Sequence, residues 1–169
     1  MNMIISAVSQ GLLWSILALG LFVSFRILDL ADMTTEGAFP LGAAVAVQAI
    51  TLGANPYIAI IFAIIAGSSA GLITGFLITK LQIPSLLAGI LTMTGLYSIN
   101  LRVMGRANIS LLGKNTIFTV FENMNLPRHF DTITLGLLVV VLIIGLYVIF
   151  FKTEFGQAVI ATGDNEAMA

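Results

Sequence analysis

Long apolar stretches without a charged residue alternate with short polar segments along this chain of 169 residues. The uncharged stretches cover residues 1–25, 37–79, 81–101 and 132–151. Because a helix needs about 20 apolar residues to cross the hydrocarbon core of a bilayer, each stretch is long enough for one span, and residues 37–79 are long enough for two. The pattern predicts an all-α, polytopic transmembrane helix bundle of about five spans.

The composition favours a membrane protein over a soluble one. Hydrophobic residues make up 59% of the chain and charged residues only 9%, whereas a soluble domain carries about 25% charged residues. A soluble protein with very apolar helices is disfavoured, since such helices are usually shorter and keep a polar face. The first apolar run lacks the basic start and the cleavage site of a signal peptide, so we expect it to be retained as a span.

Candidate chemistry is sparse. The net charge of −1 indicates no basic surface for nucleic acid, and a chain without cysteine forms no disulfide and uses no thiolate. The single histidine, His129, has no partners at metal-ligand spacing. No phosphate-binding loop, zinc-protease motif or serine elbow is present. We therefore expect no catalytic residue, no metal and no cofactor, which favours a transport subunit or a structural membrane subunit over an enzyme.

A polar segment, residues 29–37 (DLADMTTEG), interrupts the apolar pattern after the first span. One interpretation is ordinary capping, in which Asp32 or Thr34 caps the next helix and Glu36 lies in its first turn. The other is a broken or re-entrant helix that starts at membrane depth and lines a cavity. The run that follows, residues 37–53, is at the lower limit for a full crossing.

Two later spans carry small and polar residues in distinct patterns. Residues 56–79 hold Gly67, Gly71 and Gly75, which recur every four positions and predict a face for close helix packing. Residues 85–101 hold serine, threonine and asparagine, which are costly in lipid unless they face protein or a water path, or bond their own helix backbone. The candidate substrate-path residues are Asp32, Thr34, Thr35, Glu36, Thr92, Ser98 and Asn100.

The end of the chain is a polar tail. Residues 102–131 form a long polar connection to the fifth span, and residues 152–169 follow that span. The tail begins as an amphipathic helix candidate and then reads GDN, a turn signal in which Asp164 or Asn165 can cap a new helix starting at Glu166. The chain stops inside that helix, so the sequence looks truncated.

Three stretches resemble permeases in the branched-chain amino acid and ribose group of ABC importers. Residues 11–46 (GLLWSILALGLFVSFRILDLADMTTEGAFPLGAAVA) are similar to a leading helix of the GLxxxLxALGL kind, followed by a polar break and a small-residue run. Residues 155–169 (FGQAVIATGDNEAMA) resemble the cytoplasmic coupling segment of that family, and residues 79–113 resemble most closely its tryptophan or tyrosine import branch. Where the wider group has a break of the INFGHG kind, this chain has ADMTTEGAF, so substrate contacts cannot be carried over from that motif.

The resemblance implies that residues 1–169 are the N-terminal part of one ABC permease transmembrane domain, with residues 152–169 as its cytoplasmic coupling segment. It implies a multi-pass protein of the cell membrane that moves a small solute, such as the amino acid tryptophan. The implied partners are a cytoplasmic ABC ATPase, an extracellular substrate-binding protein, and a second permease copy in a homodimer within the lipid bilayer. The implied ATPase-coupling residues are Phe155, Gly156, Gly163, Asp164, Asn165 and Glu166.

A cytoplasmic tail would place residues 102–131 outside and Lys80 inside. We favour a re-entrant second segment, which puts the N-terminus inside; a full crossing would put it outside. The charge distribution runs against this topology, because the connection placed outside carries more Lys and Arg than the loops placed inside. The competing function is a non-ABC membrane subunit or a secondary carrier, in which Asp29, Asp32 or Glu36 would couple ions.

Overall fold

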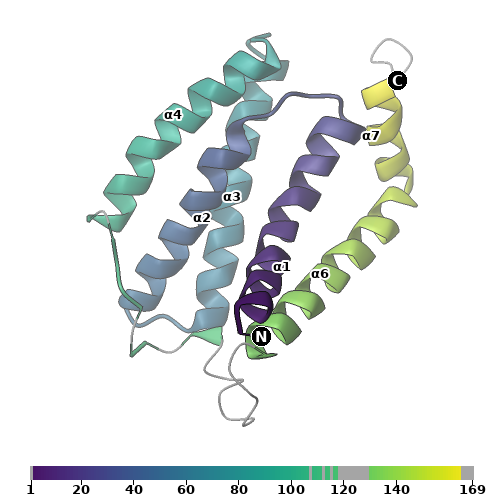
Figure 1. The fold of residues 1–169 in the computed structure, drawn as a ribbon. Helices are drawn as coiled ribbons and strands as arrows, with labels where there is room; N and C mark the ends of the chain where they lie inside the picture. The colour runs from purple at the N-terminus through teal and green to yellow at the C-terminus, as the bar shows by residue number, and fades with distance from the viewer. Residues whose placement is uncertain (1, 107, 112, 115, 118–129, 165–169) are drawn as a thin grey trace. The chain divides into compact units, whose positions relative to one another are not determined.

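The computed structural model describes residues 2–106, 108–111, 113, 114, 116, 117 and 130–164, and every regular element among them is helical (Figure 1). The prediction of an all-α bundle is therefore confirmed. The elements are α1 (Asn2–Phe22), the π-helix η1 (Val23–Ile27), α2 (Thr34–Thr51), α3 (Pro56–Thr79), α4 (Ser85–Met104), α6 (Phe130–Phe151) and α7 (Glu154–Asp164).

Four helical stretches in the described residues are long and apolar enough to cross a membrane. They are Met3–Ile27, Pro56–Thr79, Ser85–Met104 and Ile133–Phe151, and they correspond to the first, third, fourth and fifth predicted spans. The second predicted segment is α2, which has 18 residues, is less apolar than α3 and carries Glu36 in its first turn. The chain is therefore a multi-pass membrane protein in which α2 differs from the spanning helices.

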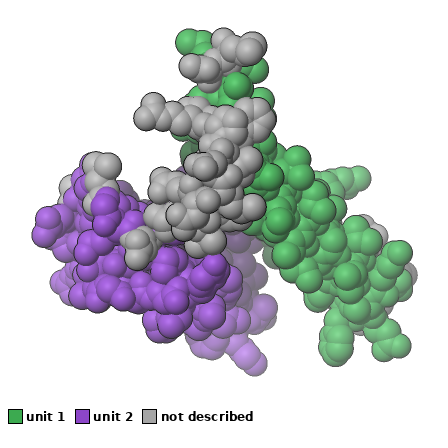
Figure 2. All heavy atoms as spheres, turned by 90° about the horizontal axis from the view of Figure 1, so that it is seen from below, with its two compact units in different colours: residues 1–30, 121–169 green, residues 31–120 purple. Residues whose placement is uncertain are grey.

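The chain divides into two compact units, which Figure 2 colours separately. The first consists of Met1–Leu30 and Phe121–Ala169 and contains α1, η1, α6 and α7. Inside it, α6 packs along α1, while α7 contacts η1 and the end of α6. The second unit is Ala31–Val120, in which α2 packs against both α3 and α4 (Figure 1). The short helix α2 is thus the central helix of its unit.

Small residues let the helices of the second unit approach closely. A Cβ added to Gly37 on α2 would lie 3.0 Å from the Cα of Met93 on α4. A Cβ added to Gly89 on α4 would lie 2.8 Å from the backbone nitrogen of Met33. Close backbone approach of this kind is how helices associate in lipid, where burial of apolar side chains gives little drive. One cluster of buried apolar side chains takes a residue from each helix: Leu41, Ala70 and Leu96.

Local sequence signals explain where α3 begins and where α4 ends. The side-chain oxygen of Asn55 accepts a hydrogen bond from the Tyr57 N–H at 3.2 Å, and Pro56 occupies the first helical position. Helix α4 ends at Met104, and the next residue, Gly105, has a φ of 65°, the left-handed conformation that closes many helices. The predicted bounds of the third span, residues 56–79, agree with α3.

The polar break between η1 and α2 supplies the start of α2. The N-cap residue of α2 is Met33, which makes no side-chain capping bond, so neither predicted residue occupies the cap position. Asp32, one residue earlier, accepts a hydrogen bond on Oδ1 from the Thr34 N–H at 2.8 Å, and Glu36 lies in the first turn, as predicted. Thr34 is already helical and directs its hydroxyl elsewhere. Pro40 lies inside α2 and has no N–H to offer the Glu36 carbonyl, which weakens the helix near its start. The re-entrant interpretation stays a prediction.

Candidate functional site

Three buried threonines, one from each helix of the second unit, form a hydrogen-bonded chain. The Thr34 Oγ1 lies 2.8 Å from the Thr74 Oγ1, which lies 3.0 Å from the Thr92 Oγ1. Their exposed fractions are 1%, 3% and 7%. Each hydroxyl has a single proton, so if Thr74 donates to Thr92, then Thr34 must donate to Thr74, and Thr92 donates to the carbonyl of Ala88 at 3.0 Å. The cluster joins α2, α3 and α4 through polar groups that would be costly to leave unpaired in lipid.

One turn beyond this cluster along α2, Asn100 crosses from α4 to the backbone of α2. Its Nδ2 donates a hydrogen bond to the carbonyl of Gly37 at 3.3 Å. Its Oδ1 is buried and accepts no hydrogen bond from the described part of the chain, and the same holds for the hydroxyl of Thr35. A buried acceptor without a donor costs roughly 1–3 kcal/mol, so the Asn100 oxygen is an exception that calls for an explanation.

A pocket of about 590 Å³ lies between α2 and α4, next to Asn100. Its size is within the range of about 300–1,000 Å³ that is typical of small-molecule sites. Exposed Glu36 is the only charged residue among the described residues of its lining, and Thr94, Tyr97 and Asn100 add polar groups. The lining is Glu36, Gly37, Pro40, Met93, Thr94, Tyr97, Asn100, Leu101 and Met104.

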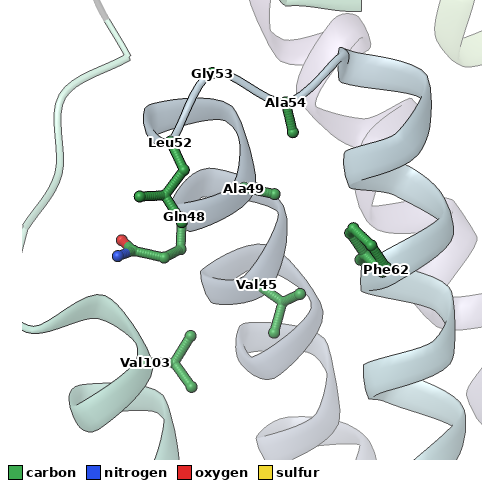
Figure 3. A pocket seen from close by; sticks show the side chains of 8 residues that line it. All are labelled: Val45, Gln48, Ala49, Leu52, Gly53, Ala54, Phe62 and Val103. Carbon is green, nitrogen blue, oxygen red and sulfur yellow. The ribbon is translucent and has the colours of Figure 1, made fainter.

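A second pocket, of about 530 Å³, lies at the C-terminal end of α2 (Figure 3). Figure 3 shows Gln48 and Leu52 extending from α2 on one side of it and Phe62 of α3 on the other. Of the described residues in this lining, Gln48 alone has a polar side chain. The pocket between α2 and α4 is therefore the richer of these two in groups that could recognise a polar ligand.

In the first unit, the tail helix α7 is held by two glycines. A Cβ added to Gly156 would overlap the carbonyl oxygen of Phe150, and one added to Gly163 would overlap the carbonyl oxygen of Ile27 at the end of η1. The two glycines are two helical turns apart and therefore lie on one face of α7. Phe155, in contrast, is 82% exposed. The glycine face packs α7 onto its own unit and leaves an aromatic side chain available for other contacts.

Comparison with known proteins places the chain in a family. A family profile described as "Branched-chain amino acid transport system / permease component" matches residues 3–169. The chain belongs to this permease family. No solved structure matches the permease.

Three curated relatives are similar to the chain over most of its length. The permease is 39% identical over 168 residues to the "Tyrosine transport system permease protein" of Clostridioides difficile (strain R20291), an alignment that covers 99% of this chain and 54% of the relative. It is 41% identical over 144 residues to an uncharacterized protein of Rickettsia prowazekii (strain Madrid E), covering 85% of this chain and 51% of the relative. It is 31% identical over 119 residues to the "Autoinducer 2 import system permease protein LsrC" of Yersinia enterocolitica serotype O:8 / biotype 1B, covering 70% and 31%. The permease thus spans about half the length of the first two relatives.

The structure separates the predicted substrate-path residues of the permease into several environments. Glu36 and Asn100 line one pocket, whereas Thr34 and Thr92 belong to the threonine cluster. The remaining predicted residues lie apart from that pocket's lining: Asp32 at the start of α2, Thr35 with a buried hydroxyl, and Ser98 on an exposed face of α4. Their role in transport stays a prediction.

Sequence reasoning missed Thr74 and Tyr97. Thr74 bridges Thr34 and Thr92, and Tyr97 lines the pocket with Glu36 and Asn100. A threonine in an apolar helix usually bonds its own backbone, so the signal for Thr74 was too common to single it out. Tyr97 stands one helical turn before Asn100, and that spacing on α4 could have revealed it.

The predicted packing and coupling residues are placed as follows. On α3, a Cβ at Gly67 would lie 3.9 Å from the Ala38 carbonyl oxygen, whereas one at Gly71 or Gly75 would meet no atom within 4 Å. The interface predicted for that glycine face stays a prediction. On the tail, α7 runs through Gly163 and Asp164, so the turn predicted at Gly163 is wrong there: the glycine serves close packing inside a helix. Asn165 and Glu166 lie outside the described residues.

Proposed function

We propose that the permease is a translocation subunit of a binding-protein-dependent ABC importer that moves a small amphipathic solute, such as tyrosine or tryptophan. The family match and the relative named as a tyrosine transport permease support this proposal. A separate cytoplasmic ATPase supplies the energy, an external binding protein delivers the solute, and a second permease copy completes the path. In this proposal the chain forms part of the solute path and transmits the movement of the ATPase, and it catalyses no reaction.

The arrangement of α7 is the observation that carries the proposal. Closure of an ATPase can move the membrane spans of the permease only if a rigid segment connects the two proteins. Helix α7 follows α6 after a two-residue joint in which the Thr153 N–H and hydroxyl both donate to the Phe150 carbonyl, at 3.0 and 2.6 Å. The Thr153 Oγ1 also accepts from the Gly156 N–H at 3.2 Å. These bonds fix the angle between the last span and the tail.

The far end of the tail helix is fixed to a different span. Gly163 packs on the carbonyl of Ile27, the last residue of η1, and residues 28–33 lead from there to α2. A force applied at exposed Phe155 would therefore act on α6 through the joint and on the end of the first span through Gly163. π-Helical turns are rare and often mark functional sites, which is consistent with a role for η1 in passing on this force.

ATP-dependent uptake tests the proposal directly. The permease would be co-expressed with candidate ABC ATPase and binding-protein subunits, reconstituted in liposomes, and supplied with ATP and radiolabelled tyrosine or tryptophan. The expected result is uptake that needs ATP and the binding protein and does not need an ion gradient. Uptake that continues without ATP, or failure of every ATPase to bind the permease, would contradict it.

The position of Glu36 keeps a secondary carrier as the second candidate function. Glu36 is an exposed acid in the lining of the α2–α4 pocket, and ion-coupled carriers use acids in such positions. A carrier would show uptake driven by a proton or sodium gradient and lost in Glu36→Gln. Uptake that is indifferent to both gradients would remove this candidate.

A further inference from the structure

The pocket between α2 and α4 carries charge of one sign only among its described lining residues. Glu36 offers a carboxylate, which only accepts hydrogen bonds when ionised. Among the described residues that line the pocket it is the only charged one, and none is a lysine or an arginine. The pocket thus favours a cationic hydrogen-bond donor over an anion.

The orientation of the Asn100 amide adds a second acceptor. The Nδ2 must face the carbonyl of Gly37, because the opposite orientation would set two oxygens against each other. This leaves Oδ1 as a buried acceptor that no described residue satisfies, in a side chain with only 9% exposure. Gly37 directly follows Glu36, and both Glu36 and Asn100 line the pocket.

The rest of the lining is apolar or aromatic. Two methionines, a leucine, a proline and a tyrosine ring form most of it: Met93, Met104, Leu101, Pro40 and Tyr97. Thioether and aromatic side chains adapt to apolar ligands of different shape, and an aromatic face also attracts an ammonium group. The volume of about 590 Å³ is large enough for a solute with a ring.

We propose that this pocket binds a solute that carries a primary ammonium group on an apolar or aromatic body. The ammonium donates to the Glu36 carboxylate and, after a small adjustment of the side chain, to the Asn100 Oδ1. The body lies against Met93, Tyr97 and Met104. Naming this ligand as the transported substrate rests on the proposed function; the binding itself does not.

The lack of cysteine in the chain allows a direct binding test. Thr94→Cys places one thiol in the pocket lining, at an exposed residue whose hydroxyl bonds only to the carbonyls of Ile90 and Leu91 on its own helix. Ser69→Cys places a control thiol at an exposed position of α3 outside that lining. Each variant would be reconstituted in lipid nanodiscs and labelled with the neutral reagent N-ethylmaleimide.

The probes are 2-phenylethylammonium and its neutral isostere 2-phenylethanol. At equal millimolar concentration, the ammonium probe should slow labelling of Thr94→Cys at least fivefold more than the alcohol does, and neither should affect Ser69→Cys. Adding Glu36→Gln should abolish the difference in protection between the two probes, and Glu36→Asp should retain part of it. The attraction between a carboxylate and a nearby bound cation, at the effective dielectric constant of a protein surface, is large enough to account for a fivefold difference.

Equal protection by the two probes would overturn the proposal, as would protection that survives Glu36→Gln. Sodium chloride that protects as well as the ammonium probe at equal concentration would also overturn it, because the pocket would then bind a simple cation. The assay uses neither ATPase nor binding protein. Its failure would leave the importer function open, and failure of ATP-dependent uptake would leave the pocket assignment open.

Discussion

Gly163 of the tail helix packs so closely on the carbonyl oxygen of Ile27 that no larger residue fits between them. Helix α7 is therefore tied to the end of the first span as well as to the last one. The contact combines a glycine inside a helix, where glycine is unfavourable, with the exposed carbonyl end of a π-helix. Glycine is tolerated there because close packing requires it.

Gly163→Ala should loosen α7 from η1. The added methyl overlaps backbone, which cannot rotate away, so we expect a loss of about 1–3 kcal/mol of local stability. Amide hydrogen exchange across Glu154–Asp164 should then accelerate by about tenfold or more. The matched control is Gly145→Ala in α6, where an added Cβ meets no atom within 4 Å. Similar exchange of α7 in the two variants would show that the Gly163 contact does not hold the tail.

Thr74→Val should destabilise the second unit. Valine has nearly the shape of threonine but neither donates nor accepts, so the substitution leaves the Thr34 and Thr92 hydroxyls without their shared partner. Hydrogen bonds between membrane helices are worth about 0.6–2 kcal/mol each, and we expect a total loss of about 1–2 kcal/mol in the free energy of unfolding in bicelles. Thr94→Val is the control, because its hydroxyl bonds only its own helix backbone. Equal losses of unfolding free energy in Thr74→Val and Thr94→Val would show that the hydrogen bonds among the three threonines do not stabilise the second unit.

Gly89→Ala should separate α4 from the start of α2. The new Cβ would lie 2.8 Å from the Met33 nitrogen, which is backbone and cannot yield by a rotamer change. We expect a loss of about 1–3 kcal/mol, measured as a lower unfolding temperature in detergent. Gly95→Ala, on the same helix but with no atom within 4 Å of its Cβ, should be neutral or stabilising. An unchanged unfolding temperature for Gly89→Ala would mean that the segment around Met33 does not pack against α4 as the structure shows.

Phe155→Ala should weaken the association with an ATPase without disturbing α7. Exposed aromatic side chains often dominate an interface, and truncating one commonly costs about 2 kcal/mol or more, so we expect a Kd about 30-fold higher. Hydrogen exchange of α7 should be unchanged, since Phe155 is 82% exposed in the permease. Val148→Ala, also exposed but inside the last span, should leave the Kd unchanged. An unchanged Kd for Phe155→Ala would mean that the tail contacts the ATPase through other residues.

The sequence was most informative where a local signal sets the structure. The Asn-Pro pair at residues 55 and 56 defines the start of α3, and the uncharged windows reveal the spanning helices, because both depend on residues close together in the chain. Asp32 was recognised for the same reason, as an acid just before a helix.

The features that depend on how the helices pack could not be predicted from the sequence. Which threonine meets which cannot be derived without the register of three helices, so Thr74 was missed. Gly163 was interpreted as a turn residue because GDN is a common turn signal, whereas the backbone of Ile27 requires a glycine inside the helix. The pocket combines Glu36 with Tyr97 and Asn100 across two helices, and only the fold brings them together.

A cysteine cross-link can show whether the exposed face of α7 meets an ABC ATPase. Phe155→Cys would be introduced into the cysteine-free permease, co-expressed with the candidate ATPase carrying a single surface thiol beside its nucleotide site, and treated with a short bis-maleimide. Gln157→Cys, which is also exposed but lies two residues on and therefore on the opposite face of α7, is the control. We expect a cross-linked permease–ATPase species from Phe155→Cys, with little from Gln157→Cys. No cross-link from Phe155→Cys, or equal cross-linking from both positions, would contradict it.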